Sequence, residues 1–142
     1  MHQPFIDKIK QYYDQHDQTD TFDHLIAPYI LRLEVGLATI QWDAKSIFMN
    51  RYGAIHGGAL AGLVDVVGAI ATLSLGKRVV TTDLSISFLK MGTLETTIRA
   101  EAYVFHRGRS IMRTSVQLFN ERDQLMVQAQ LSFFVLGDLT LE

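Results

Sequence analysis

The sequence predicts an α+β fold in which a curved antiparallel sheet wraps one long helix. The first observation is residues 57–76, a stretch of 20 residues whose only formal charge is Asp65, which favours a helix buried on most of its circumference. The second is a change to strand-like segments with short links after this stretch, and strands linked in this way pair antiparallel. One small sheet cannot cover such a helix on every side, so we expect a second copy of the chain to help.

The length and composition are those of one folded domain, expected over 1–142 with an N-terminal helix and loop over 1–24. The 142 residues are 48% hydrophobic and 20% charged, which excludes a mainly disordered chain. The net charge of −2 argues against a nucleic-acid partner, which needs a basic face. A carboxylate at Asp65 argues against a membrane span. The absence of cysteine fits the cytoplasm, where we expect the protein, and the histidines lack metal-ligand spacing, so we expect no metal.

The N-terminal third is expected to contain one helix and two strands. Apolar residues at three- and four-residue spacing predict a short amphipathic helix over 3–15, and the polar segment 14–23 predicts a loop. Strands are predicted over 29–34 and 37–42, which are rich in β-formers. An irregular connector follows over 45–53.

The rest of the chain is expected to be the long helix and four strands. The helix is predicted over 57–75. From Val80 to Phe88 apolar and polar residues alternate, which predicts a strand with one apolar and one polar face. This alternation places Thr81 on the polar face, opposite to Leu84. Further strands are expected over 96–105, 110–119 and 125–135.

The start of the long helix is a candidate carbonyl-binding site. The first turn of a helix has unpaired N–H groups and a partial positive charge, which can hold a carbonyl oxygen that becomes negative during acyl transfer. The alternative is that Gly57 and Gly58 merely permit a tight turn. His56 could donate to a substrate, or it could cap the helix. Asn50 could bind the carbonyl or a water, or it could be a turn residue.

Asp65 is the candidate base or nucleophile. Its sequence neighbours are leucine and valine, and a carboxylate kept in such surroundings is a candidate functional group. The alternative is a buried carboxylate bonded to a Thr or Ser hydroxyl. Gly57 and Asp65 lie eight residues apart on one helix, about 12 Å along its axis. If both act on one substrate, Asp65 must come from a second copy, which predicts composite sites in a two-fold dimer.

A set of residues around the start of the long helix forms a recognisable pattern: Asn50, Gly53, His56, Gly57, Gly58, Leu63 and Asp65. This pattern resembles that of a known family, the hotdog-fold acyl-CoA thioesterases of the phenylacetate-degradation type. The similarity continues through the strand 81–90, the link 108–110 and the final strand 126–134.

The resemblance implies a fold, an assembly and a set of roles. The sheets of two subunits would join in a homodimer, and dimers could pair into a homotetramer. The Gly57 N–H would polarise the thioester carbonyl, and Asp65 of the neighbouring subunit would attack it or activate water. Thr81 would help to place that water. Asn50 and His56 would orient the substrate or the nucleophile.

The substrate implied by the resemblance is acyl-CoA, and because CoA is part of this substrate, no cofactor is expected. Cations near the site mouth would bind the CoA phosphates. Each of them could equally be a solvated surface charge. The family commonly has Phe-Leu-Arg-Pro where this chain has Phe88-Leu89-Lys90-Met91. The substrate-binding candidates are Gly58, Lys90, Arg107, Gly108 and Arg109, with Lys77 and Arg78 as further cations. The apolar slot for the acyl group could use Phe48, Met49, Leu60 or Leu63.

The sequence therefore predicts an acyl-CoA thioesterase that releases the free acid and CoA. Two other functions stay open. One is a non-catalytic module that binds acyl-CoA or a fatty acyl group and does not need Asp65. The other is a hotdog hydratase or dehydratase of enoyl thioesters, in which His56 and Asp65 would meet across subunits.

Overall fold

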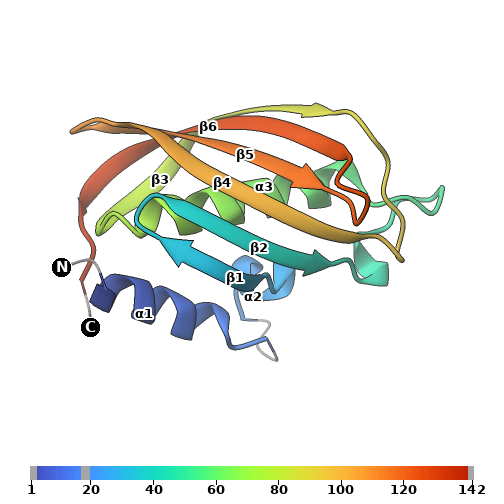
Figure 1. The fold of residues 1–142 in the computed structure, drawn as a ribbon, viewed down its shortest axis with the longest axis horizontal. Helices are drawn as coiled ribbons and strands as arrows, with labels where there is room; N and C mark the ends of the chain where they lie inside the picture. The colour runs from blue at the N-terminus through green and yellow to red at the C-terminus, as the bar shows by residue number, and fades with distance from the viewer. Residues whose placement is uncertain (1–2, 17–19, 141–142) are drawn as a thin grey trace.

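The predicted α+β architecture is confirmed in the computed structural model, which describes residues 3–16 and 20–140 (Figure 1). The elements in chain order are α1 (Gln3–Tyr13), α2 (Phe22–Ile26), β1 (Tyr29–Glu34), β2 (Leu37–Asp43), the 3-10 helix η1 (Ser46–Phe48), α3 (Gly57–Leu73), β3 (Lys77–Phe88), β4 (Thr97–Arg107), β5 (Ile111–Phe119) and β6 (Leu125–Asp138).

One antiparallel sheet carries all six strands, in the order β1-β2-β4-β5-β6-β3. Figure 1 shows the curved strands crossing over α3, with α1 beside β1. Apolar side chains of the sheet alternate toward α3 because successive strand residues point to opposite faces. The core between sheet and helix is fully buried and contains Ile40, Trp42, Ile98, Val116, Leu131, Leu63, Val67 and Ile70. β1 and β3 are the two open edges of the sheet.

β3 departs from the predicted alternation at one point. Thr81 pairs with Phe133 and Asp83 pairs with Ser132, so Thr82 is an extra residue that forms a bulge. The bulge reverses the face assignment before it. Thr81 therefore points toward α3, as Leu84 does, and Val80 is 46% exposed. The predictions that Thr81 lies on the solvent face and Val80 on the core face were both wrong for this reason.

The N-terminal helix is confirmed, and the structure adds a short helix that the sequence did not indicate. α2 begins inside the predicted loop 14–23 at Phe22. The Thr21 hydroxyl accepts a hydrogen bond from the His24 N–H at 3.2 Å and caps the first turn. Ala27 ends the helix in the left-handed conformation, with φ of 54°. Five residues are too few to show a helical period.

α3 carries the positions that matter for the site. It has 17 residues, and within 3–16 and 20–140 no helix combines the length and apolarity of a membrane span. The buried residues of α3 pack in the core with the sheet. Along another stripe of the helix, four residues are half-buried: Gly62, Asp65, Ala69 and Leu73. α3 therefore has one face in the core and one face that this chain leaves partly open.

Candidate active site

The loop before α3 is a tight turn built by Asn50. Its side-chain oxygen accepts from the backbone N–H groups of Tyr52 at 2.8 Å and Ala54 at 3.0 Å. Gly53 has φ of +82°, which favours glycine at this point of the turn. Asn50 is thus a turn residue whose oxygen is already used, and only its amide NH₂ group can be offered to a substrate. The turn leads to His56, whose backbone N–H donates a hydrogen bond to the Phe48 carbonyl at 2.8 Å.

His56 caps α3, as one of its two predicted roles requires. Its Nδ1 accepts a hydrogen bond from the Gly58 N–H at 2.8 Å, and its carbonyl accepts from Ala59 and Leu60. A Cβ on Gly58 would lie 3.1 Å from His56 Nδ1, so glycine permits this close cap. Gly58 is therefore needed for the turn, and its N–H is not available to a substrate.

The Gly57 N–H is the open donor of this helix start. The next three N–H groups all bond to His56, and no acceptor for Gly57 lies within the described part of the chain. A free N–H on the first turn, where the helix dipole is positive, binds a carbonyl oxygen that gains negative charge. The structure thus leaves one backbone donor free at the start of α3.

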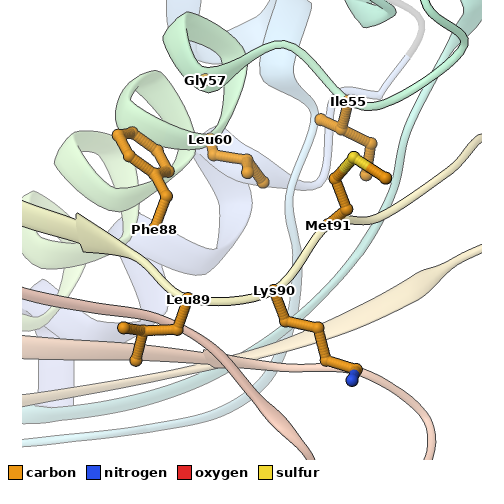
Figure 2. A pocket seen from close by; sticks show the side chains of 7 residues that line it. All are labelled: Ile55, Gly57, Leu60, Phe88, Leu89, Lys90 and Met91. Atoms are coloured by element: carbon orange, nitrogen blue, oxygen red, sulfur yellow. The ribbon is translucent and has the colours of Figure 1, made fainter.

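The Gly57 donor borders a hollow of about 270 Å³, named here the first hollow (Figure 2). Figure 2 shows the Phe88 ring directed at Gly57 and Leu60, while Lys90 points away from the helix. A Cβ on Gly57 would be 3.6 Å from the Phe88 ring, an ordinary contact distance, so the ring lies beside Gly57. The first hollow is lined by Ile55, Gly57, Leu60, Phe88, Leu89, Lys90 and Met91.

The side chain of Asp65 on α3 is oriented by Thr81 on β3. The Thr81 hydroxyl donates to Asp65 Oδ1 at 2.6 Å, across the gap between α3 and β3. The bulge at Thr82 makes this contact possible because it turns Thr81 to the helix side. Oδ2 of Asp65 has no hydrogen-bond partner among the residues described, and the side chain is half-buried. One carboxylate oxygen is therefore oriented and the other is open.

Gly57 and Asp65 do not meet in one copy of the chain. They are on the same helix, about 12 Å apart along its axis, and Asp65 does not line the first hollow. The structure brings Gly57, Phe88 and Lys90 together as one group, and Asp65 with Thr81 as another. Each group is incomplete for catalysis on a single carbonyl.

The remaining cation candidates lie at the other end of α3. Arg107 contacts the turn at Gly36, since a Cβ there would be 2.6 Å from its Nη2. The Gly36 N–H in turn donates to Ser74 just after α3, about 25 Å along the helix from Gly57. Gly108 bonds to the Ile111 carbonyl and keeps this hairpin tight. Arg107, Gly108 and Arg109 are therefore far from Lys90 within one copy.

Sequence reasoning missed two features of the site. Phe88 was not a site candidate, although it lies against the donor. The bulge was missed as well, and its signal was available: Thr81, Thr82 and Asp83 are three polar residues in a row, which breaks a strict alternation. Among the candidates for the apolar slot, Leu63 belongs to the core, while Leu60 lines the first hollow.

Comparison with known proteins gives a consistent result. A model of the thioesterase superfamily matches residues 52–127. Acyl-coenzyme A thioesterase PaaI of Escherichia coli is 27% identical over 95 residues, which are 67% of this chain and 68% of that protein.

Two solved structures resemble the chain over most of its length. A hypothetical thioesterase of Streptococcus pneumoniae, solved with coenzyme A, has a TM-score of 0.78 at 27% identity and covers 80% of this chain and 88% of its own. The E. coli PaaI protein has a TM-score of 0.83 at 23% identity, covers 96% and 99%, and shows the shared fold.

Proposed function

This chain belongs to the thioesterase superfamily, and on that premise we propose that it hydrolyses acyl-CoA thioesters to the free acid and CoA. Thioester hydrolysis is the activity of its family, and the acyl-CoA substrate is supported by the E. coli relative and by the relative solved with coenzyme A. The single observation that carries the proposal is the free Gly57 N–H at the start of α3.

The active site is completed by a second copy of the chain. The 12 residues of β3 form an open sheet edge, and such an edge is normally paired or protected. Pairing of two β3 strands about a two-fold axis sets the two α3 helices antiparallel. The start of one helix then approaches the middle of the other, where Asp65 is half-buried. The same symmetry brings Arg107 and Arg109 toward the partner's site mouth, where CoA phosphates need cations.

In the proposed reaction, the Gly57 N–H and Asp65 act on the same thioester carbonyl. The Gly57 N–H stabilises the negative oxygen of the tetrahedral intermediate. Asp65, oriented by Thr81, takes a proton from the attacking water, the C–S bond breaks, and CoA leaves as the thiolate and is protonated. Alternatively, a carboxylate oxygen of Asp65 attacks the carbonyl carbon, the C–S bond breaks and CoA leaves as the thiolate. Water then hydrolyses the resulting mixed anhydride, which releases the free acid and regenerates the Asp65 carboxylate. No cofactor takes part in either route.

The test is an Asp65→Asn variant assayed with a panel of acyl-CoAs and thiol detection. Loss of a positioned base or nucleophile is expected to lower kcat/KM by about 10²–10⁴. Asp83→Asn is the matched control, because it changes the same group on β3 on the opposite face of the sheet. Wild-type rates in Asp65→Asn on every hydrolysed substrate would overturn the assignment.

The two other functions predicted from the sequence give different outcomes in the same assay. A binding module would retain acyl-CoA without releasing thiol. A hydratase would consume a 2-enoyl thioester without releasing thiol, and it would need His56 as an acid or base. Nδ1 of His56 is engaged as the helix cap, which leaves only Nε2 for such a role.

A further inference from the structure

A second hollow lies on the other side of the α3 start. It measures about 220 Å³, and none of its lining residues is Lys, Arg, Asp or Glu. Two of its apolar side chains are open to solvent: Phe22 is 54% exposed and Ile47 is 73% exposed. The lining residues of this second hollow are Phe22, Ile47, Phe48, Met49, His56, Gly58 and Ala59.

We infer that the second hollow is the acyl subsite and that Phe22 and Ile47 determine which acyl groups are hydrolysed. This inference rests on the proposed function, because it assigns a part of the substrate to each side of Gly57. It predicts that the preferred substrates have an uncharged acyl group with the bulk of one aromatic ring or a medium-length alkyl chain.

The two hollows are neighbours through consecutive residues. Gly57 borders the first hollow, and His56 and Gly58 border the second. A thioester carbonyl bound to the Gly57 N–H has two substituents, the acyl group and the pantetheine sulfur, which point in different directions. Lys90 borders the first hollow and points away from the helix, where it can meet a phosphate beyond the hollow, so the first hollow suits the CoA side (Figure 2). The second hollow has no formal charge and is left for the acyl group.

His56 keeps the second hollow uncharged. Because Nδ1 accepts the Gly58 N–H at 2.8 Å, the ring proton is on Nε2 and the imidazole is neutral in this arrangement. The other lining side chains are apolar or absent, so a charged acyl terminus would find no partner of opposite charge there.

Phe22 is placed by a glycine on α3. A Cβ on Gly62 would lie 2.7 Å from the Phe22 ring, so only glycine lets the ring approach the helix so closely. One edge of the ring is thereby fixed while 54% of the side chain stays exposed. An acyl group in the second hollow would cover Phe22 and Ile47, and each methylene that it buries is worth about fourfold in affinity.

The size of the second hollow sets the acyl class. An apolar cavity of about 150 Å³ in another protein holds benzene. The second hollow, at about 220 Å³, is larger than that but remains short of a long fatty chain. Phe22, Ile47, Phe48 and Met49 also lie outside residues 52–127, which match the family model. The match to the family model therefore carries no expectation about these four side chains.

The test compares one control with two variants that are expected to change the preferred acyl-chain length in opposite directions. Ile47→Trp fills the second hollow from an exposed position, so we expect the ratio of kcat/KM for octanoyl-CoA to that for acetyl-CoA to fall about tenfold. Phe22→Ala widens it, so the preferred chain is expected to become longer by two or more carbons. Leu31→Trp is the control, because Leu31 is 59% exposed on β1, the edge strand opposite β3. The control should leave the octanoyl-to-acetyl ratio unchanged.

A binding measurement separates the two proposals. The affinity of 2-oxoalkyl-CoA ketones, which cannot be hydrolysed, is measured against chain length by calorimetry. A gain per methylene that Ile47→Trp removes supports the acyl subsite, even if no thioester is hydrolysed and the proposed function fails. Hydrolysis by the wild type with chain-length selectivity unchanged in both variants would overturn the subsite and leave the function standing.

Discussion

The two ends of α3 treat their polar groups in opposite ways. At the C-terminal end, Thr72 donates to the Gly68 carbonyl and contacts Thr114, each at 2.8 Å. Ser74 donates to Ala71 and accepts from Gly36. Thr72, Ser74 and Thr114 are completely buried. At the N-terminal end, Gly57 keeps an unpaired N–H beside a hollow.

This difference separates an end of the helix whose buried hydroxyl groups are all hydrogen-bonded from an end that keeps a free donor. A buried hydroxyl with all partners present stabilises one arrangement, because removal of one partner leaves the other unpaired. An unpaired N–H at the edge of a hollow contributes nothing to that arrangement and is free for a ligand. We therefore expect substitutions at the C-terminal end of α3 to change the stability of the protein and substitutions at the N-terminal end to change the rate of hydrolysis.

Gly57→Pro tests the N-terminal end of α3, and among the substitutions at the two ends of this helix we expect it to have the largest effect. Proline is well tolerated at the first position of a helix and removes only the N–H. His56 already has φ of −61° and ψ of 137°, the extended backbone that a residue before proline adopts. The fold should stay intact while kcat/KM for acyl-CoA falls about 10²–10³, the usual cost of one lost oxyanion donor.

Gly57→Ala is the matched control for the proline variant. It keeps the N–H, and its Cβ would meet the Phe88 ring at an ordinary contact distance of 3.6 Å. Activity close to wild type in Gly57→Ala, together with loss in Gly57→Pro at an equal Tm, supports the free-donor role. Equal activity in both variants would show that the Gly57 N–H does not bind the substrate carbonyl.

Ser74→Ala tests the opposite end of α3. The substitution leaves the Gly36 N–H without its acceptor, which costs about 1–3 kcal/mol of unfolding free energy. Urea unfolding measures this loss, and kcat/KM per folded molecule should not change. Ser85→Ala is the control on an exposed position of β3 and should change stability by less than about 0.5 kcal/mol. A rate loss in Ser74→Ala at unchanged stability would contradict the comparison.

Most of the fold could be predicted because its signals are local. The apolar stretch at 57–76 and the alternation in later strands identify α3 and the sheet, and the resemblance to hotdog thioesterases is confirmed. α2 could not be predicted, since its five residues are stabilised by a Thr21 cap and by packing of Phe22 on α3. Such a helix depends on tertiary contacts more than on its own pattern.

The site was predictable only in part, because contacts across elements decide it. His56 at a helix start indicated a cap, and Asp65 among apolar residues indicated a functional carboxylate; the structure supplies the Gly58 and Thr81 contacts. The direction of Thr81 followed from a bulge that depends on pairing with β6. Phe88 became part of the site through the path of β3 past the helix start, which no local pattern records.

The smallest expected effect concerns α2, which carries Phe22 to the N-terminal end of α3. His24 is buried between two acceptors: Nδ1 lies 2.8 Å from Asp20 Oδ1, and Nε2 lies 3.0 Å from the Tyr12 carbonyl. The hydrogen bond to Asp20 raises the pKa of His24, and the hydrogen bond from His24 lowers the pKa of Asp20. The hydrogen bonds at the other end of α3 involve only hydroxyl and backbone groups.

The stability of the α2 end should therefore depend on pH, and that of the Ser74 end should not. The contribution of His24 to stability is complete below its unfolded pKa of about 6.5 and is lost as pH rises through its higher folded pKa. The contribution of Asp20 to stability is present above its unfolded pKa of about 3.9 and is lost as pH falls through its lower folded pKa. Hydrogen exchange, corrected for intrinsic rates, should show weaker protection of α2 amides at pH 9 than at pH 6, with the Gly36 amide unchanged. Asp20→Asn should reduce this difference. Equal changes at α2 and at Gly36 would mean that the two ends of α3 open together, and the separation between them would not hold.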